Sequence, residues 1–414
     1  MLNEGSDNDE KLLSPKGSRL CELRRLLFET PSAFIISTDY FNDFVESNSL
    51  QADIIEQIQK GLNICENECE KVYGSFKDHE PLLLSVRVGA PINHTNICAP
   101  IYESSSMTDS GLISLLGTPD SWNLPGVQET MIGIGINDEI CNHLASFTNL
   151  RYALTIYAKF VVSYGITICK IPYSTYDNIL YKVMSANSIS NVSQLEEQQL
   201  QQLISMFKEV YNPPTDPWDQ LYCAITEAYR HWIENTEQRQ LMMDMKADSP
   251  IAVIVSAVVY GQPGILFSRN PVNGLKTVLC GDILLENGIK LSLEEFKRTN
   301  ANLGEMMEYA AKVLESNFRD LQDIDFVIDD RKKSLYIIQS RSASRTAAAS
   351  LRVAVDLVHE RILNEREALL RIVPDKLLNL SLKPFFTPND VPFAVGTGII
   401  IIININIIIT IIIR

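Results

Sequence analysis

The sequence is short of positive charge. Lys and Arg number 36 among its 414 residues, against 51 Asp and Glu, so the formal net charge at pH 7 is −15. General nucleic-acid binding needs a basic surface, and this balance therefore argues against a nucleic-acid partner. Any phosphate group that the chain binds must be held at a small local site, where a few cations outweigh the overall negative charge.

Cysteine pairs at metal or disulfide spacing are also missing. The eight Cys mostly stand singly in apolar runs, as Cys169 and Cys280 do. This placement is typical of small core residues in a reducing compartment. Cys65 and Cys69 are four residues apart, but no second Cys or His pair follows at zinc spacing, so we expect no zinc site.

A secretory signal is absent from the start of the chain. Residues 1–10 are polar and acidic, without the basic start and apolar stretch of such a signal. We therefore expect a disordered tail there, and a cytoplasmic protein that makes no membrane contact.

The opposite end has an unusual composition, since residues 399–413 contain twelve Ile. The run is shorter than the ~20 residues of a membrane-spanning helix. Its β-branched side chains favour an extended, aggregation-prone strand. The alternative, which we prefer, is a translated repeat without function.

The rest of the sequence has the pattern of a folded α+β protein. Apolar residues make up 46% and charged residues 21%, which is typical of a soluble globular chain. Periodicity predicts strands near residues 34–38, 81–86, 252–260, 265–268 and 277–285, and mainly helix at 138–245 and 346–373. In the last helical region, Leu351, Val355, Val358 and Ile362 are expected on one buried face.

Residues 323–341 carry the most informative motif. Two alternating apolar runs flank a polar turn and predict a β-hairpin. Side chains two apart share a strand face, so Asp323 and Asp325 should point away from the core. One antiparallel register then sets Asp323 opposite Arg341 and Asp325 opposite Gln339.

Such a group suits a metal-bound phosphate. Carboxylate and amide oxygens are ligands that Mg²⁺ prefers, and a guanidinium matches phosphate oxygens bidentately. The simpler alternative is a cross-strand ion pair between Asp323 and Arg341 on a solvated sheet face.

Other segments offer weaker phosphate-binding candidates. Lys16 lies in what we expect to be a flexible turn at 14–18, and Arg87 ends the predicted strand at 81–86. The loop at 124–130 could direct backbone N–H groups at a phosphate. Each has an ordinary explanation: a solvated Lys, a surface ion pair and a Pro-Gly turn.

Together these segments resemble the N-terminal, nucleotide-binding part of the pyruvate, phosphate dikinase family, from about residue 11 to about residue 386. The resemblance is clearest at Leu83–Ala90, Asp216–Leu221, Phe267–Pro271, Asp320–Arg345, Arg345–Ala349 and Glu367–Arg371.

The resemblance implies an ATP-grasp-like fold with a helical insertion, using ATP and Mg²⁺. Such an enzyme loads a pyrophosphoryl group onto a histidine in the next domain, which swivels to a barrel that binds pyruvate. The implied segments are a disordered tail at 1–10, an N-terminal ATP-grasp subdomain at 11–135 with an inserted loop at 92–123, a helical subdomain at 136–250, a second β-rich ATP-grasp subdomain at 251–345, linker helices at 346–386 and an aberrant Ile-rich tail at 387–414.

Site residues follow from the same resemblance. Arg87 and Arg341 are the residues expected to act in catalysis. The implied ATP-binding residues are Lys16, Arg87, Gly126, Thr130, Asp282, Gln339 and Arg341, and the implied metal-site residues are Asp323, Asp325 and Gln339.

The chain also departs from the family pattern. Asp325 and Asp282 stand where the family has Glu, and roughly thirty residues are inserted at 92–123, a length that surface loops tolerate. None of the five His has the Thr-Ser/Cys-His setting of the phosphoacceptor, and the sequence stops where that domain should begin.

Two functions remain open on the sequence alone. In the first, the chain is the ATP-binding half of a dikinase-like phosphotransferase, whose acceptor histidine and pyruvate site lie on a separate chain. In the second, it is a degenerate or truncated paralogue that acts at most as a nucleotide-binding module. Either function leaves a homodimer open.

Overall fold

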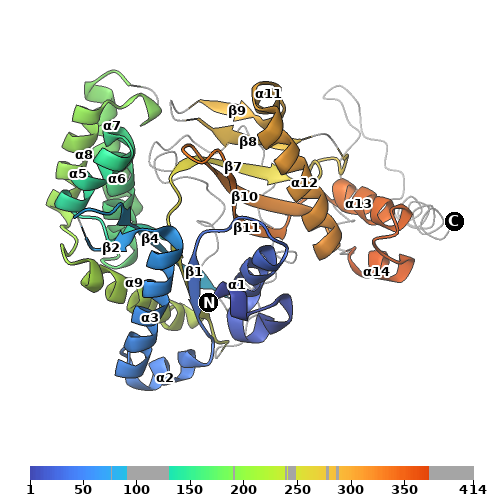
Figure 1. The fold of residues 1–414 in the computed structure, drawn as a ribbon, viewed down its shortest axis with the longest axis horizontal. Helices are drawn as coiled ribbons and strands as arrows, with labels where there is room; N and C mark the ends of the chain where they lie inside the picture. Colours follow the sequence, from blue (N-terminus) through green and yellow to red (C-terminus); the bar gives the residue numbers. More distant parts are fainter. Residues whose placement is uncertain are drawn as a thin grey trace, which may run out of the picture.

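The computed structural model describes residues 1–372 apart from 76, 91–129, 190–191, 238–239, 241–248, 277–278 and 286–288. Within this part, two antiparallel sheets are surrounded by helices (Figure 1), which confirms the α+β class. The inserted loop at 92–123, residues 373–386 of the expected linker and the Ile-rich tail lie outside the described residues.

The first sheet has the strand order β1-β6-β4-β5, and every neighbouring pair is antiparallel. Its strands are β1 (Ala33–Ile36), β6 (Ala252–Ala257), β4 (Leu84–Gly89) and β5 (Met131–Ile134). All six residues of β6 are buried, as expected of a β-branched central strand. A short parallel pair, β2 (Val72–Tyr73) with β3 (Pro81–Leu82), lies beside it.

Helices cover one face of this sheet. They are α2 (Tyr40–Ser47), α3 (Ala52–Cys69), α5 (Asp138–Phe147), α6 (Leu150–Thr167), α7 (Tyr173–Ala186), α8 (Glu197–Val210) and α9 (Pro217–Glu234). The break at 212–217 sets the start of α9, because Asp216 accepts hydrogen bonds from the backbone N–H groups of Trp218 and Asp219 while Pro217 occupies the first turn. One large apolar cluster joins these helices to the first sheet.

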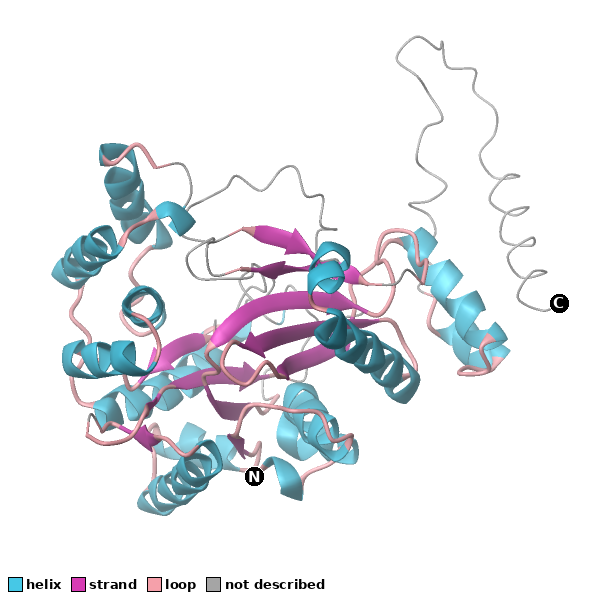
Figure 2. Cartoon of the chain, turned by 45° about the horizontal axis from the view of Figure 1, so that its top comes forward, coloured by secondary structure: helices cyan, strands magenta, loops and turns pink. Residues whose placement is uncertain are grey.

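The second sheet has the order β11-β10-β7-β8-β9 and is also antiparallel throughout. Its strands are β7 (Gly261–Phe267), β8 (Cys280–Leu284), β9 (Lys290–Ser292), β10 (Gln322–Asp329) and β11 (Leu335–Ser342). Figure 2 shows the strands of both sheets as a central layer with helices outside. The helices α11 (Leu293–Thr299) and α12 (Ala301–Phe318) pack on one face through a second apolar cluster.

Helix α1 (Glu10–Arg25) joins the two sheets. It contacts β1, β4 and β6 of the first sheet and β11 of the second. Its buried residues Leu20 and Leu23 belong to the cluster that also contains Ile254 of β6 and Ile324 of β10. The position of this helix therefore sets how the two sheets face each other.

Three sequence predictions differ from the structure. Residues 1–10, expected as a disordered tail, form two 3-10 turns (Leu2–Glu4 and Asp7–Asp9) and the start of α1, because Leu2 is buried in the second cluster. The expected boundary at 251 does not separate the sheets, since β6 pairs with β1 and β4. Pairing between distant segments leaves no local signal in the sequence.

The third difference concerns the linker helices α13 (Ala347–His359) and α14 (Glu365–Leu370). Their buried residues are Ala349, Val353, Ala354, Leu357 and Ala368, whereas the four apolar residues predicted to be buried, at 351, 355, 358 and 362, are only half-buried. The most buried face is therefore offset from the predicted one, although Val358 and Ile362 still pack against the apolar cluster of these helices. A capping box between Asn364 and Glu367 begins α14.

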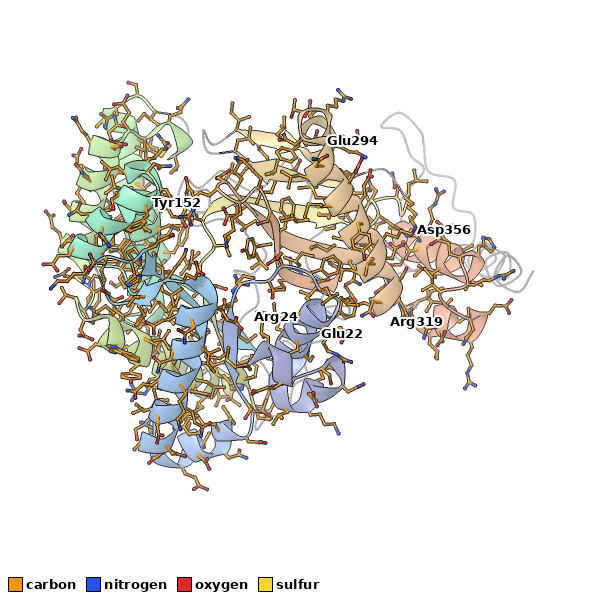
Figure 3. The ribbon with its side chains drawn as sticks, viewed as in Figure 1. Glu22, Arg24, Tyr152, Glu294, Arg319 and Asp356 are labelled. Carbon is orange, nitrogen blue, oxygen red and sulfur yellow. The ribbon has the colours of Figure 1, made fainter. Side chains whose placement is uncertain are left out.

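A buried ionic group attaches α13 to the second sheet. Arg269, which follows β7 and is fully buried, donates two hydrogen bonds to Glu315 of α12 at 3.0 and 2.8 Å. It also contacts Glu360 at 2.8 Å and Asp356 at 3.2 Å. Figure 3 shows Asp356 and Arg319 close to this junction. Charge pairing therefore supplements the small apolar contact of α13.

Among the described residues, the helices are all too short or too polar to cross a lipid bilayer.

We expect the substitution Arg269→Met to lower the free energy of unfolding by about 3–5 kcal/mol, because it leaves the Glu315 carboxylate, 2% exposed, with a much weaker set of partners. Urea unfolding measures this change. Asp356→Asn removes a contact whose acceptor is 38% exposed and should cost less than about 1 kcal/mol. Equal effects of the two substitutions would contradict this assignment.

Candidate functional site

The predicted hairpin is present with the predicted register. Asp323 of β10 pairs with Arg341 of β11, and Asp325 pairs with Gln339. Ile324 and Phe326 face the second cluster and are buried. The register shifts directly after Asp325, leaving Ile338 as an extra residue, and such bulges bend a strand locally.

Residues of two further strands share the face of Asp325. Ile265 of β7 pairs with Asp325 on one side and with Asp282 of β8 on the other. Paired residues project to the same side of a sheet, so Gln339, Asp325, Ile265 and Asp282 form one row across four strands. At about 4.8 Å per strand, Asp282 lies roughly 10 Å from Asp325.

Asp323 and Arg341 form a direct ion pair. Nε of Arg341 donates to Oδ2 of Asp323 at 2.9 Å, and Nη2 lies 2.8 Å from the same oxygen. The side chains are only 7% and 18% exposed, so this is not the solvated surface pair of the simpler alternative. Oδ2 of Asp323 therefore orients a guanidinium, which leaves it less suited to bind a metal.

A second guanidinium comes from the first sheet. Arg87 of β4 pairs with Ile254 of β6, which in turn pairs with Ile35 of β1. Ile254 and Ile35 contact the cluster shared with α1 and the second sheet, so Arg87 is on the face directed at them. Its buried Nε has no hydrogen-bond partner among the described residues. A buried donor without a partner is costly and is free to accept an anionic ligand.

Lys16 is brought to the same place by α1. The sequence predicted a flexible turn here, but Lys16 lies inside the helix, and its Nζ is 3.4 Å from the carbonyl oxygen of Val88 in β4. Ser14 has non-helical angles of φ 66° and ψ 163°, a region that essentially only glycine occupies. Ser14 packs directly on Gly89, where an added Cβ would come within 2.1 Å of the serine Oγ. The kink thus fits α1 closely against the end of β4.

The charges of these groups act on one another. Burial and the nearby charges of Arg87 and Arg341 lower the pKa of Lys16 to about 8, and Asp325 partly opposes this effect. Burial also lowers the pKa of Arg87, while Asp325 again favours its charged form. The structure therefore brings three cations from α1, β4 and β11 together, with Asp325 facing them.

Asp325 and Gln339 are the residues that fit a divalent cation. They are directly opposite each other, and no hydrogen bond or ion pair occupies Asp325 within the described part of the chain. Oxygen donors of this kind suit Mg²⁺, which commonly takes one or two protein ligands and completes its shell with phosphate oxygens and water. The described residues contain no group of three or more His, Cys, Asp or Glu that could hold a metal by themselves.

The remaining predicted site residues are not drawn into this cluster. Asp282 is 44% exposed and pairs with Lys290 at 2.9 Å, at the far end of the shared row. Thr130 directly precedes β5. Gly126 and the rest of the expected phosphate loop up to residue 129 lie outside the described residues.

One further contact that holds the cluster was not predicted from the sequence. Nη1 of Arg19, one turn after Lys16, donates to Oε1 of the fully buried Gln322 at 2.8 Å. Its guanidinium also lies 4.0 Å from the centre of the Phe318 ring. Arg19 thereby fixes α1 to the base of the hairpin. The only sequence signal for this contact was the three-residue spacing of Lys16 and Arg19, which places both on one side of a helix.

A concavity of about 380 Å³ lies elsewhere, between the start of α5, α6, the end of α8 and residues 212–215. Its lining includes Lys208, which already pairs with Asp138 at 2.7 Å. None of the predicted site residues lines it. The candidate site is thus defined by converging charge and strand register.

Comparison with known proteins supports the resemblance seen in the sequence. The chain is 29% identical to a pyruvate, phosphate dikinase of Rickettsia typhi over 409 residues, covering 91% of this chain and 43% of the relative. It is 28% identical to the enzyme of Clostridium symbiosum (94% and 43%) and 27% identical to the chloroplastic enzyme of Flaveria trinervia (94% and 39%). No family model matches the chain.

The predicted resemblance to a divergent N-terminal part of these dikinases is therefore confirmed at the level of sequence. The chain spans less than half the length of the curated relatives that it matches.

We expect Ser14→Gly to raise the free energy of unfolding by about 1 kcal/mol, because glycine removes the strain at this backbone position and the gain exceeds its entropy cost. Thermal unfolding measures the change. Ser14→Ala keeps the strain and serves as the matched control, which should not be stabilised. A Ser14→Gly variant no more stable than Ser14→Ala would show that the kink is unstrained.

Proposed function

We propose that this chain is the nucleotide-binding part of a pyruvate, phosphate dikinase-like phosphotransferase, with an ATP-grasp-type arrangement that binds MgATP between its two sheets. The phosphoryl group would pass to a histidine outside the described residues, on a further domain or a separate chain. The similarity to named dikinases over 91% of the chain supports the reaction class.

One observation supports the location of the site above all others. Lys16, Arg87 and Arg341 belong to α1, β4 and β11, yet the charges of Arg87 and Arg341 help to lower the pKa of Lys16, and the charge of Arg341 helps to lower that of Arg87. Asp323 pairs with Arg341 and Asp325 faces Lys16 and Arg87, so three cations share two nearby carboxylates. A polyphosphate would supply the missing negative charge and a partner for the buried Nε of Arg87.

Each residue then has a separate task. Arg87 and Arg341 would neutralise charge on the phosphate oxygens, and Lys16 would act as a point charge from the helix. Asp323 would orient Arg341, while Asp325 and Gln339 would hold Mg²⁺, which when bound neutralises charge on the phosphates. Phosphoryl transfer depends mainly on positioning and electrostatic stabilisation, and these residues supply both.

A second candidate is a nucleotide-binding module without catalysis. It is favoured by Asp325, whose side chain is one methylene shorter than the Glu that the resemblance implies at this position. Both candidates bind a nucleotide, but only the first transfers a phosphoryl group. Transfer of phosphate from ATP to an added histidine-bearing dikinase domain supports the first, and binding without transfer supports the second.

We expect Arg87→Met to act in opposite directions on stability and on binding. Removing a buried cation with a partnerless Nε should leave the free chain as stable or up to about 1 kcal/mol more stable. The same change should weaken MgATP binding by at least tenfold, because a charged phosphate contact is lost. Thermal unfolding and isothermal titration calorimetry measure the two effects.

Arg25→Met, on the exposed side of α1, is the matched control and should leave binding unchanged. If the unsubstituted chain gains no thermal stability in millimolar MgATP, the proposed function is wrong. If Arg87→Met binds as well as the parent, the site lies elsewhere.

Binding should also take up protons in mildly alkaline solution. Lys16 has a pKa of about 8 in the free chain, and a bound polyphosphate raises it by favouring the charged amine. Near pH 8.5 we expect uptake of roughly half a proton per MgATP, and an affinity that falls as the pH rises further. Calorimetry in buffers of different ionisation enthalpy counts these protons. Lys16→Met should abolish the uptake, and persistent uptake in that variant would assign it to another group.

A further inference from the structure

The turn between β10 and β11 makes a second contact with the part of the chain that leads into the first sheet, in addition to the contact of Arg19 with Gln322. Nη1 and Nη2 of Arg331 donate to the two carboxylate oxygens of Glu80 at 2.7 and 3.0 Å. Glu80 directly precedes β3, and its side chain is only 14% exposed. Lys71, beside β2, also contacts Glu80 at 2.8 Å. Arg331 lies in the turn, two residues after the end of β10, and the four strand positions from Asp325 to Asp329 already span roughly 13 Å.

The turn itself is rigid. Oδ1 of Asp329 accepts hydrogen bonds from the backbone N–H groups of Arg331 and Lys332 at 2.8 and 2.9 Å. Nε2 of Gln262 in β7 donates to Oδ1 of Asp330 at 2.8 Å. These hydrogen bonds connect the turn that carries Arg331 to β10 and β7.

The crossover between the sheets is part of the same contact. Tyr260 lies between β6 of the first sheet and β7 of the second, and the guanidinium of Arg331 is 5.7 Å from its ring centre. Its hydroxyl accepts from Nδ2 of Asn149 at 3.0 Å, and its ring meets that of Tyr152 edge-on at 4.4 Å. Tyr152 is labelled in Figure 3, on α6.

The charges favour a paired state. Burial raises the pKa of Glu80, but the hydrogen bonds from Arg331 and the charge of Lys71 outweigh it and hold that pKa below its usual value. The hydrogen bonds to Glu80 likewise raise the pKa of Arg331. Both groups are thus charged at neutral pH, and the ion pair is bidentate and partly shielded from water.

The ion pair between Arg331 and Glu80 opposes an electrostatic repulsion between the hairpin and the first sheet. Lys16, Arg87 and Arg341 are like charges carried by α1, the first sheet and the hairpin, and like charges oppose the close approach of the elements that carry them. Arg19 opposes this repulsion at the base of the hairpin through Gln322, and Arg331 opposes it at the turn through Glu80.

We propose that Glu80 and Arg331 are positioning residues that hold the hairpin over Lys16 and Arg87, so that the phosphate site stays assembled before the nucleotide arrives. This inference rests on the proposed function. Without the ion pair, only a fraction of the free molecules has the sheets in the binding geometry, and the apparent affinity falls by that fraction.

The test is a double-mutant cycle on the full chain, with MgATP affinity as the readout. Arg331→Gln and Glu80→Gln should each raise the Kd for MgATP about 3- to 10-fold, as expected for loss of one partly buried ion pair. The double variant should be no worse than either single one. Arg331→Lys, which keeps the charge without the bidentate geometry, should lie between the parent and Arg331→Gln.

Glu56→Gln is the matched control, because it breaks an exposed pair with Lys60 on α3 that joins no second element. Its Kd should equal that of the parent. A merely structural role predicts that Arg331→Gln lowers the melting temperature with an unchanged Kd, and this result would overturn the proposal, as would additive effects in the double variant.

A second measurement keeps the inference separate from the proposed function. If the parent chain binds no MgATP, the proposed function fails, and small-angle scattering of the nucleotide-free chain then decides about the ion pair. Arg331→Gln should increase the radius of gyration at low salt while Glu56→Gln should not. Identical scattering of the three proteins would refute a role of this ion pair in holding the sheets together.

Discussion

The junction of α1, β4 and β11 places Lys16, Arg87 and Arg341 close enough for their positive charges to act on one another, and the site depends on how this charge is offset. Three cations in partly buried positions are unfavourable unless negative charge is close. Asp323 neutralises Arg341 directly, and Asp325 acts on the other two from a distance. Under the proposed function, the remaining positive charge would attract an anionic ligand.

The fold offsets this cost at positions outside the charge cluster. Helix α1 is fixed to the first sheet where Ser14 meets Gly89 and to the second sheet where Arg19 meets Gln322. The apolar residues of α1, β6 and β10 share one cluster, which adds hydrophobic stabilisation across the junction. The energy that holds the site together is thus largely supplied by residues that would touch no ligand.

The sequence predicted the parts of the site that depend on local pattern. Period-2 alternation was enough to place Asp323 opposite Arg341 and Asp325 opposite Gln339, because a hairpin with a short turn has few registers that bury Ile324 and Phe326. It could not assign β6 to the first sheet, since pairing between segments distant in sequence leaves no periodic signal. It also placed Lys16 in a flexible turn, because Pro15 usually interrupts a helix and the strained angles of Ser14 that permit this one are set by packing on Gly89.

The pairing of β4 with β5 has a consequence for how this chain can change. These strands are hydrogen-bonded neighbours at one margin of the first sheet, with Val86 opposite Met131, so sequence positions on either side of 91–129 lie close together. Closing a loop between adjacent anchors costs little more entropy when the loop is long than when it is short. The connection between β4 and β5 is therefore a position where added sequence, including a grafted reporter domain, should cost little stability in the first sheet that carries Arg87.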